Sequence, residues 1–158
     1  MEKDIKSDML ELIRTTSDHA DFRALVVLLD QDLAIRDGEE HAFYAQYNKI
    51  DKIGHVIVAY DNGRAVACGA IKHYADQTAE VKRMFVLPEF RGNGIAGFVL
   101  RDLEKWAAEL DYSECILETG KKQPEAIRLY QKCGYELIPN YGQYAGVENS
   151  VCMKRAVR

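Results

Sequence analysis

The feature that most constrains this chain is the segment of residues 80–100, EVKRMFVLPEFRGNGIAGFVL. Alternating side chains along its first part predict a strand, and Pro88 cannot donate a ladder hydrogen bond, so pairing should stop there. Apolar residues then recur every three or four positions from Ile95 to Leu110, which predicts a helix with one buried face. The chain is therefore expected to form a strand, a glycine-rich turn and a helix in direct succession.

The turn has the composition of an anion-binding site. Gly92, Gly94 and Gly97 carry no side chains that would block a ligand, and Arg91 adds a cation beside them. We expect the helix to begin at Arg91 and to reach Asp111. The first turn of a helix presents amide N–H groups without internal partners, so a diphosphate can be bound there by the backbone.

Two motifs resemble those of the GNAT family of N-acetyltransferases. The stretch Arg91-Gly92-Asn93-Gly94-Ile95-Ala96 matches the family's acetyl-CoA signature, R/Q-x-x-G-x-G/A. Residues 126–135, AIRLYQKCGY, are similar to a later helix motif that ends in L-Y-x-K-x-G-F/Y. The resemblance is good over residues 54–138 and loose over the first part of the chain.

This resemblance implies an acetyl-CoA-dependent enzyme that moves an acetyl group directly to a primary amine. It also implies an α/β (α+β) fold, a mixed twisted sheet of about six or seven strands flanked by about four helices. The backbones of Met84, Phe85 and Val86 would hold the pantetheine arm as an added strand does, and the amides of residues 92–96 would hold the diphosphate. Gln123, where members often carry asparagine, is a further candidate cofactor contact.

The same resemblance makes Glu80 and Tyr130 the candidate catalytic residues. Glu80 lies where several members carry a general base, and Tyr130 matches a tyrosine commonly placed near the thioester sulfur. Proton transfer from an amine of pKa about 10.4 to a carboxylate of pKa about 4.3 is unfavourable by about 8 kcal/mol. Glu80 must therefore be assisted, or it serves in an ion pair with Lys82, with Arg83 or with a neighbouring strand. Tyr130 alternatively packs its helix against the sheet.

Two other functions fit parts of the sequence. The glycines of residues 92–97 also satisfy the G-x-G-x-x-G of dinucleotide-binding folds, and Glu118 stands at a suitable distance for a ribose. Residues 87–91 separate these glycines from their strand, however, which that fingerprint does not allow. The other alternative is a regulatory module that binds CoA and has no catalytic activity. The presence of both candidate catalytic residues, Glu80 and Tyr130, argues against it.

The rest of the chain predicts the remaining elements. Strands are expected at residues 9–16, 55–60, 65–74, 78–87, 114–118, 135–138 and 150–156, and helices near residues 22–37, 39–48 and 124–132. Ser17, Asp18 or Asp21 should cap the first helix. Asp61-Asn62-Gly63 predicts a hairpin turn, and Gly69 predicts a bulge or a close backbone approach.

Acidic and aromatic residues are concentrated between Asp30 and Tyr47. Such residues could hold the ammonium group of an acceptor by charge and by ring faces. Carboxylates on a helix and its loop usually form a solvated face, however, and Tyr44 and Tyr47 fit a core. The acceptor stays open between a small-molecule and a peptide amine.

Composition limits the remaining possibilities. A chain of 158 residues with 47% hydrophobic residues predicts one domain, residues 1–158. The net charge of −4 gives no general attraction to nucleic acid or to anionic membranes. Without a signal peptide or a membrane span, we expect a cytoplasmic protein, and the resemblance leaves a homodimer open. Scattered histidines, and four cysteines without C-x-x-C spacing, argue for buried thiols and against a metal.

Overall fold

Seven strands form one mixed sheet in the computed structural model, which describes residues 10–46 and 52–158. The strands are β1 (Leu10–Thr15), β2 (His55–Asp61), β3 (Arg64–Ala75), β4 (Thr78–Val86), β5 (Glu114–Gly120), β6 (Glu136–Ile138) and β7 (Ser150–Ala156). Their order across the sheet is β1-β2-β3-β4-β5-β7-β6. The predicted fold class is confirmed.

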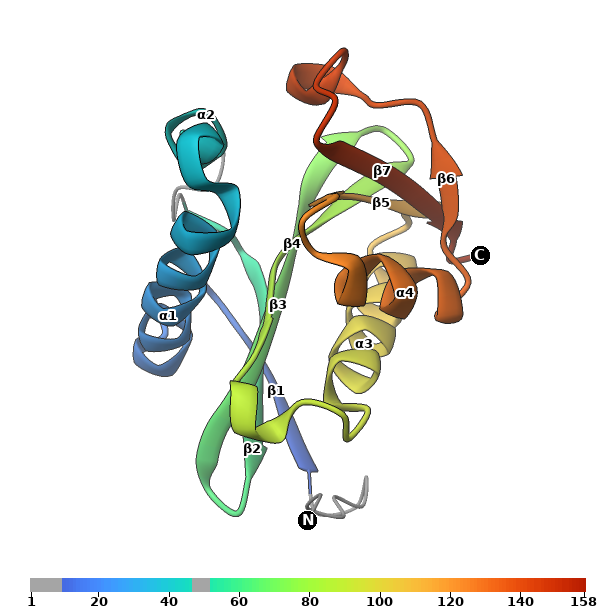
Figure 1. Cartoon of the computed structure of the whole chain (residues 1–158). Helices are drawn as coiled ribbons and strands as arrows, with labels where there is room; N and C mark the ends of the chain where they lie inside the picture. Colours follow the sequence, from blue (N-terminus) through green and yellow to red (C-terminus); the bar gives the residue numbers. More distant parts are fainter. Residues whose placement is uncertain (1–9, 47–51) are drawn as a thin grey trace.

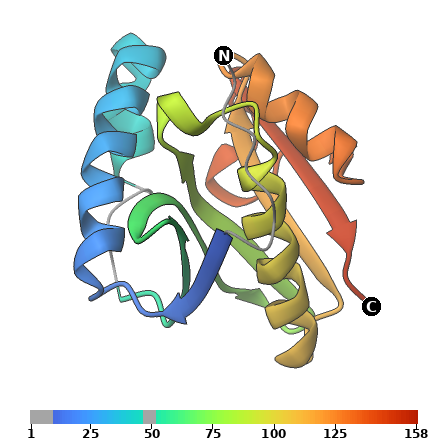
Figure 2. The ribbon, with the colours of Figure 1, turned by 90° about the horizontal axis from the view of Figure 1, so that it is seen from below.

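Helices cover both faces of the central strands. Helix α1 (Ala20–Asp37) lies on one face and α3 (Ile95–Glu109) on the opposite face (Figures 1 and 2). Because both faces are covered, consecutive residues of β2 from Val56 to Ala59 are completely buried. Helix α2 (His41–Ala45) follows a short 3-10 turn at Gly38–Glu40, and α4 (Pro124–Lys132) follows β5.

Two predicted helix starts were wrong. The cap of α1 is His19, whose Nδ1 accepts from the Asp21 amide at 3.2 Å. Ser17 is not available as a cap because its Oγ accepts from the Ile53 amide at 2.9 Å. Helix α3 begins at Ile95 instead of Arg91.

The late start of α3 has a backbone cause. Gly92 and Gly94 have φ angles of +85° and +77°, in the left-handed region, which a right-handed helix cannot include. Residues 91–94 therefore form a loop that delivers the chain to the first turn of α3. The predicted helix at residues 39–48 is shorter than expected, as α2 ends at Ala45, and its residues 47 and 48 lie outside the described residues.

A bulge deforms β4 near the middle of the sheet. The register of β3 with β4 shifts between Cys68 and Ala70, so that Arg83 and Met84 together face Gly69. A Cβ atom on Gly69 would lie 2.5 Å from the Met84 sulfur and 2.9 Å from Leu103 Cδ1, so a larger residue would force these side chains to move. Of the two alternatives predicted at Gly69, the bulge is confirmed, whereas the close neighbours of Gly69 are side chains of β4 and α3.

Strands β4 and β5 are the only parallel neighbours in the described sheet, and their pairing is short. The parallel register runs from Thr78 with Glu114 to Glu80 with Ile116. Beyond Ile116, β5 continues to Gly120 in pairing with β7. The second half of β4 therefore has an edge that β5 does not pair. The extended parallel sheet of a dinucleotide-binding fold is not present among these strands.

Candidate active site

Two cavities meet beside the unpaired half of β4, sharing Met84, Ala126 and Tyr130. We call the larger one, about 370 Å³, the loop cavity. It is lined by Met84, Phe85, Val86, Arg91, Gly92, Gly94, Ile95, Ala96, Glu125, Ala126, Leu129, Tyr130 and Lys132. The inner cavity, about 120 Å³, lies between α1, β4, β5 and α4 and includes Glu80, Glu118 and Gln123 in its lining. Of the predicted site residues, Asn93 alone lines neither cavity.

The glycine loop offers its backbone to the loop cavity. Gly94 precedes α3 and supplies no capping side chain, so the first amides of the helix have no side-chain partner at the cap. The Asn93 side chain serves the loop itself, because its Nδ2 donates to the Phe90 carbonyl at 3.1 Å. An anion in this cavity would therefore meet amide groups and partial positive charge.

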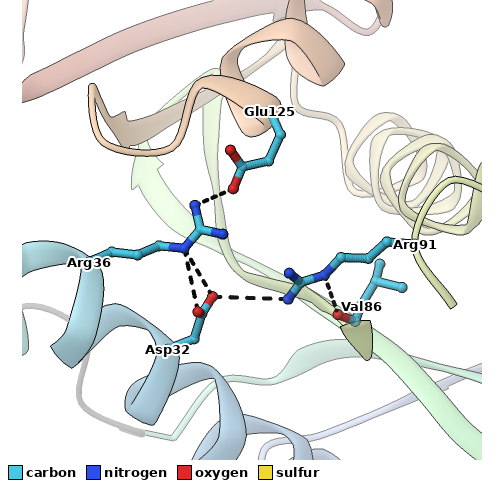
Figure 3. A network of polar contacts seen from close by, with 5 residues as sticks. All are labelled: Asp32, Arg36, Val86, Arg91 and Glu125. Carbon is cyan, nitrogen blue, oxygen red and sulfur yellow. Dashed lines mark hydrogen bonds and ion pairs between the residues drawn. The ribbon is translucent and has the colours of Figure 1, made fainter. Parts of the chain in front are cut away.

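Arg91 is held at the rim of the loop cavity. Its Nε donates to the Val86 carbonyl at 3.0 Å (Figure 3). Its guanidinium also lies 5.6 Å from the centre of the Phe85 ring. The Val86 carbonyl, one of the backbone groups predicted to bind pantetheine, thus already has a partner. The cation and the strand edge are fixed relative to each other.

Two carboxylates from neighbouring strands line the inner cavity, Glu80 from β4 and Glu118 from β5. Glu80 is buried, and its Oε2 accepts from the Tyr141 hydroxyl at 2.6 Å. Arg83, which the sequence offered as an ion-pair partner of Glu80, instead pairs with Asp30 at 2.5 Å. The loop after β6 therefore supplies a contact that sequence proximity did not indicate.

Glu118 was considered from the sequence only as a ribose contact. Burial raises the pKa of its carboxyl to about 7, and Ser150 and the positive charge of Lys82 partly oppose that shift. Its Oε2 is buried and has no hydrogen-bond partner among the described residues. A carboxyl group that titrates near neutral pH beside a cavity is suited to proton transfer. The Glu118 side chain as a whole is half-buried. The apolar run that precedes it, Cys115 to Leu117, was the available signal that this strand lies in the interior of the sheet.

Tyr130 lines both cavities from α4. Its side chain is buried, and its ring meets the Tyr135 ring edge-on at 5.9 Å. Burial raises the pKa of its hydroxyl above the ordinary value. Tyr130 therefore both packs α4 against the sheet and faces the cavities, so the two roles considered from the sequence are compatible.

The acidic and aromatic residues between Asp30 and Tyr47 have mostly structural partners. Asp30 neutralises Arg83, and Glu40 lies 3.8 Å from Lys122. Tyr44 is buried, and its hydroxyl lies 3.0 Å from the Ser150 hydroxyl. These contacts favour a solvated face and a core over an ammonium-binding rim. Tyr47 lies outside the described residues.

A third cavity of about 660 Å³, the outer cavity, continues the loop cavity between α3 and α4. The two share Gly94, Leu129 and Lys132, and the outer cavity adds Arg101 and Arg155. Arg155 is neutralised by Glu104 at 2.9 Å, which leaves Arg101 and Lys132 as cations in the lining. No motif in the sequence indicates this cavity, because Arg101 lies five residues beyond the Arg91–Ala96 motif.

The described residues contain no group of three or more histidine, cysteine or acidic side chains placed to hold a metal ion. All four cysteines have free thiols, and Cys68, Cys115 and Cys152 are buried as predicted, whereas Cys133 is half-buried. Within the same residues no helix is both long and apolar enough to cross a membrane.

The chain is similar in sequence to known acetyltransferases. The acetyltransferase (GNAT) family model matches residues 19–135. An IAA acetyltransferase of Azospirillum brasilense is 37% identical over 100 residues, covering 63% of this chain and 65% of that protein. The first three curated relatives are matched over 55–66% of their own length, less than two thirds.

Solved structures match over nearly the whole chain. A Klebsiella pneumoniae protein with the provisional name acyl-CoA N-acyltransferase has a TM-score of 0.79 and 27% identity, over 95% of this chain and 99% of that one. A GNAT family acetyltransferase of Elizabethkingia anophelis, solved with acetyl-CoA bound, has a TM-score of 0.67 and 18% identity, over 95% and 99%. Because the Elizabethkingia protein is only 18% identical to this chain, its similarity is evidence for the fold alone.

Proposed function

The chain belongs to the acetyltransferase (GNAT) family, and from this premise we propose that it is an acetyl-CoA-dependent N-acetyltransferase of a primary amine. The observation that carries the proposal is the meeting of two cavities at Tyr130. One offers an anion-binding loop and the other a carboxyl group that titrates near neutral pH. Direct transfer requires such a junction between a nucleotide site and an acid–base site.

The loop cavity suits the diphosphate and the pantetheine arm. The amides of residues 92–96 and the Arg91 guanidinium bind the diphosphate, and the backbone of Met84, Phe85 and Val86 binds the arm. Gln123 adds a contact at the inner end. The nucleotide occupies the outer cavity, where Arg101 and Lys132 supply positive charge.

In the inner cavity, the amine nitrogen attacks the carbonyl carbon of the thioester, and the carbon–sulfur bond breaks. Glu118 takes the amine proton, directly or through water. Its pKa of about 7 lies about three units below that of an ordinary amine, which halves the mismatch of an ordinary carboxylate. Glu80 is the second carboxylate of this cavity. Tyr141 holds it in place, and it positions the amine for attack.

Tyr130 interacts with the thiolate that leaves when the thioester bond breaks. Because burial raises the pKa of its hydroxyl, proton donation by this phenol is unfavourable. The hydroxyl therefore stabilises the thiolate by donating a hydrogen bond, and solvent supplies the proton.

Thiol release from acetyl-CoA, measured with the purified protein and a panel of amines, tests the proposal. We expect release that depends on one class of amine, small-molecule or peptide, together with a higher melting temperature in acetyl-CoA. A ligand at a hundred times its dissociation constant stabilises by about 2.7 kcal/mol. Binding without turnover for every amine would support the regulatory module, and no binding would overturn the proposal. The single domain, the homodimer and the cytoplasmic location stay predictions.

A further inference from the structure

Four charged side chains link three segments of the fold beside the loop cavity (Figure 3). On α1, Arg36 Nε lies 3.3 Å from the Oδ2 of Asp32, one turn earlier. The Nη1 of Arg36 pairs with Glu125 Oε1 in the first turn of α4. Asp32 Oδ2 also lies 3.9 Å from Nη2 of Arg91, in the loop that follows β4. Arg36 thus connects α1 to both walls of the cavity.

The position of Arg36 follows from its partners. Arg91 and Glu125 both line the loop cavity. Arg36 is bonded to Glu125 and shares the Asp32 carboxylate with Arg91, so the two guanidinium groups stand on either side of one carboxylate. Two permanent cations therefore gather at one anion-binding loop, although the sequence motif contains only one of them.

The charges of this network are balanced by two carboxylates. An incoming diphosphate meets Glu125 as a like charge, and it meets Arg36 and Arg91 as opposite charges. Guanidinium groups bind phosphate oxygens through paired hydrogen bonds, whereas partly exposed carboxylate pairs contribute little. The Arg36 and Glu125 side chains are 24% and 49% exposed, so their pair can open without leaving a buried charge.

We infer that Arg36 is a second diphosphate-binding residue, which exchanges Glu125 for a phosphate oxygen when acetyl-CoA binds. The inference rests on the proposed function, because it takes the diphosphate of acetyl-CoA to lie at the glycine loop. Helix α1 is joined to the bound nucleotide as a result. Glu125 holds the Arg36 guanidinium in place until the ligand arrives.

A purely structural role for the same ion pair makes a different prediction. If Arg36 and Glu125 only tie α1 to α4, removing either partner breaks the same tie and changes CoA affinity in the same direction. If Arg36 binds diphosphate, removing Arg36 weakens binding. Removing the Glu125 charge then strengthens binding, because it frees Arg36 and removes a repulsive carboxylate.

The experiment is a calorimetric titration of CoA and of 3′-dephospho-CoA, which keeps the diphosphate, into wild-type protein and three variants. Arg36→Gln is expected to raise both dissociation constants by about tenfold, the loss of a charge-assisted hydrogen bond. Glu125→Gln is expected to lower both by about two- to fivefold. Arg14→Gln removes a surface arginine that pairs with Glu109 at 2.8 Å and should change neither.

Three results would overturn the inference. Changes of the same sign in Arg36→Gln and Glu125→Gln would assign the pair to structure alone. A loss in Arg36→Gln that disappears with 3′-dephospho-CoA would place the guanidinium at the 3′-phosphate. An unchanged dissociation constant in Arg36→Gln, with melting temperature and circular dichroism also unchanged, would remove Arg36 from the site. Failure of the wild-type protein to bind CoA would overturn the proposed function itself.

Discussion

The loop cavity and the inner cavity are built in opposite ways. The loop cavity is lined by residues that are close together in the chain, Arg91, Gly92, Gly94, Ile95 and Ala96, and in the proposed function it binds its ligand mainly through backbone amides. The inner cavity takes its polar groups from separate strands and helices, and it uses side chains. Glu80 and its partner Tyr141, for instance, are 61 residues apart in the chain. A backbone site tolerates changes of side chain but not of φ angle, whereas a side-chain site responds to the loss of single functional groups.

The largest expected effect is in the inner cavity. Glu118→Gln should lower kcat by about 100- to 10,000-fold, because general-base catalysis contributes that much, and leave acetyl-CoA affinity unchanged. In the wild-type protein the rate should rise about tenfold per pH unit below pH 7 and level off above it, as the carboxyl ionises with a pKa of about 7. Steady-state rates from pH 5 to 9 measure both effects. A variant within tenfold of wild type would exclude Glu118 as the base.

The next effect tests the loop cavity through its backbone. Gly94→Val should weaken acetyl-CoA binding by about 100-fold, because valine is strained at a φ of +77° and the loop must shift. Gly63→Val is the matched control, since it places the same side chain at a φ of +80° in the turn between β2 and β3, where a Cβ atom meets nothing within 4 Å. Gly63 lines none of the three cavities. Titration calorimetry compares the two variants. Equal losses in both would show that general destabilisation, and not the conformation of the glycine loop, controls binding.

The third effect concerns the free energy of unfolding, which the partly buried carboxyl of Glu118 lowers when it is ionised. The folded-state pKa of Glu118 is about 7, above its ordinary 4.5, so folding favours the neutral carboxyl. Its favourable contribution is complete below about pH 4.5 and is lost as the pH rises through 7. Glu118→Gln should therefore be more stable than wild type by about 3 kcal/mol at pH 8, since raising the pKa from 4.5 to about 7 corresponds to about that free energy. Urea unfolding at pH 4 and pH 8 checks this, and a gain of equal size at both would contradict it.

A smaller effect is expected where one carboxylate is positioned by another side chain. Tyr141→Phe removes the hydroxyl that donates to Glu80 and should lower kcat/KM for the amine by about tenfold, with acetyl-CoA affinity unchanged. The same change at Tyr112, whose hydroxyl pairs with His73 on the surface, is the control. A loss confined to acetyl-CoA affinity would assign Tyr141 to the other cavity.

The smallest expected effect tests whether acetyl-CoA is bound mainly by backbone groups. Gln123→Ala removes a side chain at the inner end of the cofactor path and should weaken acetyl-CoA binding by only about threefold, since backbone groups carry most of the affinity. Gln131→Ala, on the exposed side of α4, should have no effect. A loss above tenfold at Gln123 would mean that the cofactor path depends on side chains as well.

The fold and the loop cavity were predictable because their signals are local. Strand alternation, the Asn62-Gly63 turn and the helix period each act over a few residues, and α4 and β7 begin and end where predicted. The start of α3 was missed because the sequence pattern does not show that Gly92 and Gly94 take positive φ angles. That choice depends on how the loop meets Phe90 and Val86.

The inner cavity was only partly predictable. Glu80 and Tyr130 came from family resemblance, whereas the Tyr141 contact and the raised pKa of Glu118 depend on the return of the chain after β6. Pairing at long sequence separation leaves no periodic pattern in the sequence. Arg36 was likewise missed, because it contacts Glu125, 89 residues later, from a helix whose charges resemble an ordinary solvated face.

The short register between β4 and β5 has a mechanical consequence. The described sheet consists of two parts, β1 to β4 and β5 to β7, whose strands pair only between Thr78–Glu80 and Glu114–Ile116. The Gln77 carbonyl adds to this short contact at one end, because it accepts from the Ser113 and Glu114 amides. A pantetheine arm lying along the remaining edge of β4 would contact both parts at once. Bound acetyl-CoA would then hold the two parts of the sheet together. Amide hydrogen exchange in β4 and in β5 would therefore slow together when acetyl-CoA is added.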